Sequence, residues 1–252
     1  MIKLKTEEEI KILKEGGRIL SMILDEVAKK VKSGVATKEL DWLAENYILK
    51  YNGEPAFKNY QPEFSLKSFP ASLCVSVNNV IVHGIPDNYL LRNGDIVKLD
   101  LGLKYKGLFT DKAITVGVGK ISSLAKKLII TTKKALLLAI KTARIGATLG
   151  DVGYIIQQYV RSQGFYEIRA LTGHGVGYKP HEEPDVLNFG TPDKGIKLKR
   201  GMVIAIEPMV AVDSSDVIEM PDGSFVTKEG GLAAHFEHTV AITDRGPLIL
   251  TK

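Results

Sequence analysis

Two segments of this chain share nearly the same sequence pattern, and this internal repeat restricts the fold more than any other feature. Residues 91–100 (LRNGDIVKLD) and residues 198–207 (LKRGMVIAIE) each give a basic turn, a glycine, a mostly apolar strand and a final carboxylate. A carboxylate that closes a buried strand is costly unless it is paired or binds a metal ion. Asp100 and Glu207 therefore predict one shared site where two related halves meet.

The repeat extends upstream of these strands. In residues 33–40 (SGVATKEL) and 145–152 (IGATLGDV), a threonine soon after a glycine is typical of a helix start. The second helix of each half is expected to end near Gly53 or Gly164. Apolar spacing predicts helices over 6–32, 38–51, 122–143 and 149–163. Strands are predicted over 72–77, 80–83, 95–103 and 108–117, with further strands and glycine-rich turns over 166–250.

Length and composition favour one domain. The 252 residues, of which 44% are hydrophobic, suffice for one large core or two fused halves. We therefore expect a single catalytic domain over 1–252, with halves of approximately 1–120 and 121–252. No apolar run approaches the roughly 18 residues of a membrane helix, and the charged N-terminal segment lacks the apolar centre of a secretory signal. Cys74, the only cysteine, fits the reducing cytoplasm.

The basic composition indicates no particular partner. The net charge is +5, and the lysines are spread widely. They include no nucleic-acid-binding motif, so we predict neither a specific nucleic-acid partner nor a membrane partner. A basic surface, above all residues 194–200, supports the hypothesis of transient contact with the ribosome.

Acidic residues occur in pairs on the apolar strands. Asp100 ends one strand, and Asp111 lies on the returning strand after a hairpin turn (KYKG). The hairpin is expected to bring the two carboxylates together, where both stay ionised only if a cation lies between them. Glu207 and Glu237 repeat this arrangement. Four carboxylates and His174 form an oxygen-rich set that favours two divalent ions of manganese, iron, cobalt or zinc.

Glycine and histidine cluster in residues 172–184 (TGHGVGYKPHEEP). The glycine spacing does not fit G-x-G-x-x-G, and the second histidine of H-E-x-x-H is missing. The better interpretation is a bend permitted by glycine, in which His174 reaches a metal ion while His181 faces a substrate. A lone histidine is more often structural, so His83 and His181 would be weak signals by themselves.

Seven short motifs are distributed along the chain: VHGIP (82–86), LDLG (99–102), TD (110–111), GHGVG (173–177), HEEP (181–184), IEPM (206–209) and FEHT (236–239). Together they resemble the type I methionine aminopeptidases over nearly the whole chain. The resemblance implies an α/β (α+β) pita-bread fold, in which two related halves of helices and antiparallel strands surround a dinuclear metal site. It also implies a monomer that removes the initiator methionine from nascent polypeptides when the second residue is small.

The resemblance assigns roles position by position. It implies that Asp111 and Glu237 bridge both ions, that Asp100 binds one ion, and that His174 and Glu207 bind the other. Metal-bound hydroxide would attack the first peptide bond, and Glu207 would carry the proton.

The resemblance also assigns residues that contact the substrate. His181 would contact the carbonyl oxygen and stabilise the tetrahedral intermediate, and His83 would contact the amide beyond it. Aromatic and thiol groups suit a flexible thioether, and the methionine pocket would be lined by Phe57, Tyr60, Phe69 and Cys74.

Two departures from the family pattern concern this pocket. Residues 61–68 form a longer link than usual. The family usually places a tryptophan soon after the Asp-Gly turn, but here residues 222–223 are followed by Phe225, which we expect to substitute for it. The only tryptophan, Trp42, lies on a predicted helix.

Alternative functions remain open on the sequence alone. Proline-specific aminopeptidases and prolidases use the same ligands, but they generally carry an extra N-terminal domain for which we expect no room. A type II methionine aminopeptidase would need a helical insertion that the short span from His181 to Glu207 does not offer. A non-catalytic pita-bread binding protein is a further alternative, although such proteins tend to lose ligands. The physiological metal also remains open, since several ions suit these ligands.

Overall fold

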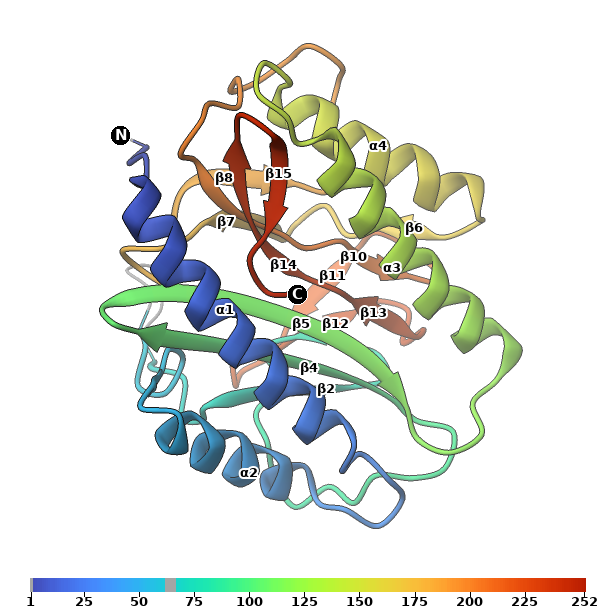
Figure 1. Ribbon diagram of the computed structural model, residues 1–252. Coiled ribbons are helices and arrows are strands. Elements are labelled where there is room, and N and C mark those ends of the chain that lie inside the picture. Colours follow the sequence, from blue (N-terminus) through green and yellow to red (C-terminus); the bar gives the residue numbers. More distant parts are fainter. Residues whose placement is uncertain (1, 62–66) are drawn as a thin grey trace.

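The computed structural model describes residues 2–61 and 67–252. Its element order repeats, because two helices precede strands in each half of the chain (Figure 1). The first half contains α1 (Glu7–Ala28), α2 (Thr37–Lys50), β1 (Glu54–Pro55), β2 (Leu73–Val77), β3 (Val80–Val82), β4 (Ile96–Tyr105) and β5 (Leu108–Gly117). The second half begins with α3 (Ser123–Thr142), α4 (Leu149–Ser162), β6 (Tyr166–Glu167), β7 (Thr172–Gly175) and β8 (Glu182–Leu187). It continues with β9 (Val203–Ile206), β10 (Met209–Ala211), β11 (Val217–Glu219), β12 (Phe225–Thr227), β13 (Ala233–His235), β14 (His238–Thr243) and β15 (Gly246–Ile249).

The helix starts follow local capping chemistry. The Thr6 side chain accepts a hydrogen bond from the backbone of Glu9, whose carboxylate in turn accepts from the Thr6 backbone, so a capping box begins α1. Thr148 forms the same box at the start of α4. Thr37, by contrast, is the first residue of α2 and not its cap, and its hydroxyl donates to Asp87 at 3.0 Å. Helix α1 ends before the predicted residue 32, because tight turns follow Ala28.

The repeated basic turns have the same backbone conformation. Gly94 and Gly201 have φ values of +103° and +84°, a region that favours glycine because it lacks a Cβ atom. Strands β4 and β9 begin just beyond these glycines. Glu207 directly follows β9 as predicted, whereas Asp100 lies inside β4 and not at its end, because the ladder with β5 continues to Tyr105. The sequence repeat is therefore also a repeat of local structure.

The segments upstream of the turns repeat as well. Gly34 donates its N–H to the carbonyl of Leu91 at 2.8 Å, and Gly146 donates to Leu198 at 3.0 Å. Both glycines have a positive φ, at +88° and +90°. The same backbone hydrogen bond therefore anchors the segment that precedes the second helix in each half.

Two sheets bring the repeated strands together. In the first sheet β4 pairs with β5 through a tight hairpin, and both turn residues, Lys106 and Gly107, have positive φ values as a type I′ turn requires. The second sheet has the order β15-β14-β9-β7-β8, with β9 at its centre. Smaller sheets, β13-β10-β6 and β11-β12-β3, adjoin these two.

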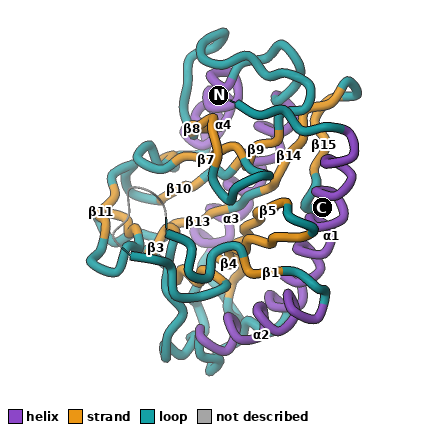
Figure 2. Tube along the Cα trace, turned by 90° about the vertical axis from the view of Figure 1, so that its left-hand side faces the viewer, coloured by secondary structure: helices purple, strands orange, loops and turns teal. Residues whose placement is uncertain are grey.

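The helices pack against the sheets through two main apolar clusters. One cluster joins α1 and α2 to β2 and β4, and the other joins α3 and α4 to β9 and β14. Ile114 of β5 packs against both clusters. Figure 1 shows α1 crossing the β4–β5 hairpin and α3 lying beside α4, and Figure 2 shows β3 and β11 on the side of the molecule opposite α1. Within the described ranges, none of the helices has both the length and the apolar character of a membrane span.

Candidate metal centre

The β4–β5 hairpin supplies the first pair of carboxylates. Asp100 lies opposite Ala113 in the ladder and Asp111 lies opposite Gly102, so the two acids are diagonal neighbours on one face. Position 102, on the same face, has room only for glycine, because a Cβ atom there would lie 2.6 Å from the ring of Phe57. The predicted approach of Asp100 to Asp111 is therefore confirmed.

The second pair lies where the chain passes between two sheets. Glu207 separates β9 from β10, and Glu237 separates β13 from β14. Strands β9 and β14 belong to one sheet, whereas β10 and β13 belong to another, so both glutamates occupy the corner between the sheets. The N–H of Glu237 donates to the carbonyl of Ala113 at 2.9 Å, which ties this corner to the hairpin.

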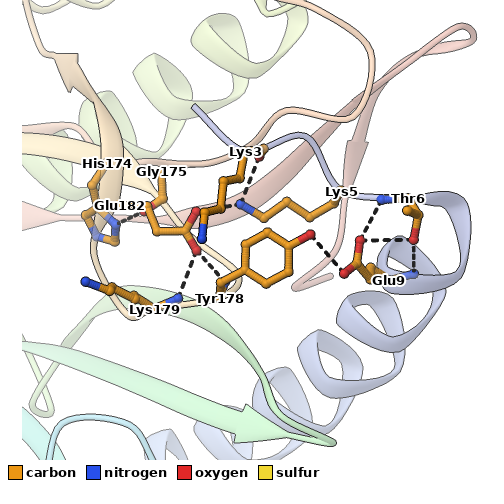
Figure 3. Close-up of polar contacts among 9 residues, drawn as sticks. All are labelled: Lys3, Lys5, Thr6, Glu9, His174, Gly175, Tyr178, Lys179 and Glu182. Carbon is orange, nitrogen blue, oxygen red and sulfur yellow. Dashed lines mark hydrogen bonds and ion pairs between the residues drawn. The ribbon is translucent and has the colours of Figure 1, made fainter. Parts of the chain in front are cut away.

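His174 approaches the corner from β7. Its Nδ1 donates to the carbonyl of Gly175 at 2.9 Å, which leaves the lone pair of Nε2 available for a metal ion (Figure 3). Nε2 lies 3.4 Å from an oxygen of Glu207. Burial lowers the pKa of His174 to about 4, so the ring is neutral at pH 7 and suited to metal binding.

The carboxylates are almost fully withdrawn from solvent. Burial raises the pKa of Asp111 to about 7. Burial, together with repulsion from neighbouring carboxylates, raises the pKa values of Asp100, Glu207 and Glu237 well above their ordinary range. One oxygen each of Asp100, Asp111 and Glu237 has no hydrogen-bond partner among the described residues. Buried, unpartnered and mutually repelling oxygens are what divalent cations neutralise, so these residues fit a metal centre.

Ligand atoms converge in two groups, and within each group they lie within 4.8 Å of one another: Asp111, His174 and Glu237, and Glu207, His235 and Glu237. The groups contain four of the predicted ligands, and Asp100 adjoins them through Asp111. The sequence prediction did not include His235. Its position two residues before Glu237 was the available signal, but the corner that turns both side chains inward depends on tertiary structure.

The ring of His181 lies next to that of His174. The two ring centroids are 4.3 Å apart, and the ring of Tyr60 stacks on His181 with the centroids 5.2 Å apart. The Tyr60 hydroxyl lies 3.1 Å from Nδ1 of His181. The surrounding protein and repulsion from His174 lower the pKa of His181, although its side chain reaches solvent. His181 is thus a neutral, accessible group next to a predicted ligand.

His83 follows β3 in an unusual backbone conformation. Its φ is +58°, which costs energy for a residue other than glycine. Its exposed ring meets the ring of Phe225 edge-on at 5.7 Å, and Phe225 pairs with Val82 across the β3–β12 ladder. Phe225 therefore packs beside His83, near the position where the family pattern has a tryptophan.

Three of the predicted pocket residues form one apolar cluster. Phe57 and Cys74 are buried in it, and Phe69 packs against them. Cys74 lies opposite Asp100 in the β2–β4 ladder, so the cluster adjoins the carboxylates. Tyr60 is not a member of this cluster and stacks instead on His181. Of the longer link at 61–68, residues 62–66 lie outside the described residues.

A polar network fixes the loop between His174 and His181 (Figure 3). Glu182 accepts hydrogen bonds from the backbone N–H groups of Tyr178 and Lys179, the latter at 2.8 Å. The ammonium of Lys5 lies 2.7 Å from the other oxygen of Glu182. The Tyr178 hydroxyl donates to Glu9 at 2.9 Å, so the network extends to the first turn of α1.

Residues 11–244 match the model of Metallopeptidase family M24. The chain belongs to this family of metal-dependent peptidases. Its particular relatives include a methionine aminopeptidase from Clostridium perfringens, which is 47% identical over 252 residues that cover 100% of this chain and 99% of the relative. A dinuclear divalent metal site is consistent with this family and with the clustered carboxylates and histidines.

Solved structures share the fold. The structure of a methionine aminopeptidase from Thermotoga maritima superposes with a TM-score of 0.96 at 41% identity, and each chain is covered completely. A prolidase from Pyrococcus furiosus gives a TM-score of 0.77 at 26% identity, with 99% of this chain but only 65% of the prolidase covered. The predicted pita-bread arrangement of helices and antiparallel strands is confirmed.

Proposed function

We propose that this protein is a methionine aminopeptidase that removes the initiator methionine when the second residue is small. The observation that carries the proposal is the convergence of Asp111, His174, Glu207 and Glu237 at one buried corner, beside Asp100. Methionine aminopeptidases match the chain over its whole length, which supports the same conclusion.

The ligand roles are those that the resemblance to the type I methionine aminopeptidases implies. Asp111 and Glu237 would bridge two divalent ions, and Glu237 belongs to both groups of converging ligand atoms. Asp100 would bind one ion, and His174 together with Glu207 would bind the other. When bound, the ions supply a water of lowered pKa and polarise the scissile carbonyl.

The remaining polar groups would act on the peptide. His181, neutral and accessible, would donate to the carbonyl oxygen and to the negative charge that develops on it. The Tyr60 hydroxyl, 3.1 Å from Nδ1 of His181, would orient that ring. His83 would contact the next amide. Glu207, next to the metal-bound water, would relay a proton from that water to the leaving amine.

The apolar cluster would hold the methionine side chain. Phe57, Phe69 and Cys74 lie against the strand that carries Asp100, and burial keeps the Cys74 thiol neutral by raising its pKa. Tyr60 would close the pocket from the side of His181. A pocket for one side chain next to the metal centre leaves little room for the second residue, which would therefore be small.

A proline-specific aminopeptidase is the alternative, because prolidases share the fold. Complete coverage of both chains by methionine aminopeptidases, against partial coverage of the prolidase, favours methionine as the substrate. A non-catalytic binding protein is disfavoured by the full set of ligands.

Peptide cleavage by metal-stripped protein tests the proposal. The substrates are Met-Ala-Ser and Ala-Pro-Ala, each assayed with manganese, iron, cobalt or zinc added back. Metal-dependent release of methionine alone supports the proposed function. Release of alanine from Ala-Pro-Ala would assign the enzyme to the proline-specific branch, and no release from either peptide with metal bound would favour a binding protein.

We further propose that the chain acts as one catalytic domain, a cytoplasmic monomer whose substrates are the N-termini of nascent polypeptides. Lys194, Lys197 and Lys199 are exposed and would favour transient contact with the ribosome. Arg200 already pairs with Asp244 at 3.2 Å. Unchanged co-sedimentation with ribosomes after all three lysines are replaced by glutamate would argue against this surface.

A further inference from the structure

His235 is a buried imidazole that the proposed mechanism does not use. Its exposed fraction is 1%, and neither ring nitrogen has a hydrogen-bond partner among the described residues. Buried polar groups without a partner are rare in proteins because they lose their hydrogen bonds to water. Its Nε2 lies 3.2 Å from Oε2 of Glu207.

The position of His235 is fixed from the other half of the chain. Its backbone N–H donates to the hydroxyl of Thr115 at 2.9 Å, and that hydroxyl donates to the carbonyl of His235 at 2.6 Å. Thr115 belongs to β5, the strand that carries Asp111. The imidazole is therefore held against Glu207 by a strand that also supplies a predicted bridging ligand.

The two oxygens of Glu207 face different imidazoles. Oε1 lies 3.4 Å from His174, and Oε2 lies 3.2 Å from His235. A ligating carboxylate commonly has its other oxygen fixed by a hydrogen bond from a neighbouring group. One oxygen of Glu207 is thus free for a metal ion while the other can accept from His235.

We propose that His235 is a positioning residue of the metal centre, whose Nε2–H donates to Oε2 of Glu207 and fixes the orientation in which Glu207 binds its ion. This inference rests on the proposed function only in taking Glu207 as a ligand. The alternative role, in which the ring itself binds metal with Glu207 and Glu237, is geometrically available and becomes an outcome of the test.

Two amide variants separate these roles. In His235→Gln the amide nitrogen lies near the position of Nε2 and can still donate to Glu207. In His235→Asn the amide lies near the position of Nδ1 and cannot reach it. We expect metal-stripped His235→Gln to bind cobalt(II) as the unchanged protein does. His235→Asn should bind at least one ion about 10- to 100-fold more weakly, as other losses of a partner that orients a ligand do.

Isothermal titration calorimetry gives the affinity of each variant for cobalt(II), and the visible absorption of bound cobalt reports its coordination. His238→Gln is the matched control, because the half-buried ring of His238 contacts Thr251 at 3.0 Å. In a Glu207→Ala background the difference between the Gln and Asn variants should vanish. Circular dichroism checks folding, and His235→Leu replaces the Asn variant should that protein fail to fold.

Equal cobalt affinity of the Asn and Gln variants, or of the Leu and Gln variants, would overturn the proposal. It would also be overturned if Gln lost affinity as Asn does and the cobalt spectrum changed, since the ring would then be a ligand. Failure of the proposed function is distinguishable, because the unchanged protein would then bind no cobalt or release no methionine.

Discussion

The ammonium of Lys5 lies 2.7 Å from Oε2 of Glu182, and both side chains are nearly excluded from solvent. Glu182 directly follows His181, so this ion pair joins the N-terminal segment to the loop that presents a substrate-facing histidine. The other oxygen of Glu182 accepts backbone hydrogen bonds in the same loop (Figure 3). The position of His181 therefore depends on a residue far away in the sequence.

Replacing Lys5 by methionine should destabilise the protein. The substitution leaves Glu182 buried without its cation, and breaking a buried ion pair in this way costs about 3–5 kcal/mol. Urea unfolding measures the loss. Lys11→Met is the matched control, because Lys11 pairs with Glu8 on the surface and its removal should leave the free energy of unfolding unchanged. Equal effects of the two substitutions would contradict this account.

Metal affinity should fall as the pH falls through 7. A carboxylate must lose its proton to bind metal, and burial raises the pKa of Asp111 to about 7 in the metal-free protein. The histidine His174, with a pKa of about 4, is already neutral in this range and contributes nothing to the change. Calorimetric titration with manganese at pH 6, 7 and 8, in buffers of different ionisation enthalpy, should show weaker binding and more released protons at pH 6. Affinity independent of pH over this range would be inconsistent with the raised pKa values.

Asp111→Asn should abolish binding of the two metal ions and yet stabilise the metal-free protein at pH 8. A pKa that is raised on folding means that the ionised group opposes folding, so the stability it contributes at low pH is lost as the pH rises through about 7. The amide has no such ionisation. Thermal melting with a chelator should therefore show the largest gain at pH 8 and a smaller gain at pH 4. A destabilised variant at pH 8 would argue against this interpretation.

His181→Ala should lower kcat by about 10²- to 10³-fold with a smaller effect on KM, as loss of one donor to a developing oxyanion does. Steady-state cleavage of Met-Ala-Ser measures both constants. Lys179→Ala, an exposed change in the same loop, is the control and should leave kcat intact. A kcat close to that of the unchanged enzyme would remove His181 from the proposed role.

The secondary structure could be predicted from sequence because its signals are local. The capping box of Thr6 lies within one turn of the start of α1, and Gly164, with a positive φ, lies within one turn of the end of α4. The approach of Asp100 to Asp111 was predictable for the same reason, since a two-residue hairpin turn fixes the register of both strands. The hydroxyl of Thr37, by contrast, bonds to Asp87 across a loop, so the pattern placed the helix start correctly but not the role of the side chain.

Two features of the site lay beyond the sequence. The approach of His235 to Glu207 depends on how the sheet of β9 and β14 meets the sheet of β10 and β13, and no local pattern encodes that crossing. The pairing of Lys5 with Glu182 likewise joins distant segments, and no pattern in the sequence links the two residues. Tertiary geometry, and not residue type, distinguishes these groups.

The candidate ligands are divided between the halves, with Asp100 and Asp111 on the β4–β5 hairpin and the others beyond α3. Two bound metal ions would thus crosslink the two halves of the chain. Thr239 adds a second tie, because its hydroxyl accepts from the N–H of Asp111 and donates to its carbonyl, both at 2.8 Å. Fragments 1–120 and 121–252, produced separately, should reassociate when divalent ions are present and separate in a chelator, which co-purification would reveal. The metal centre would then stabilise the association of the two halves in addition to its role in catalysis.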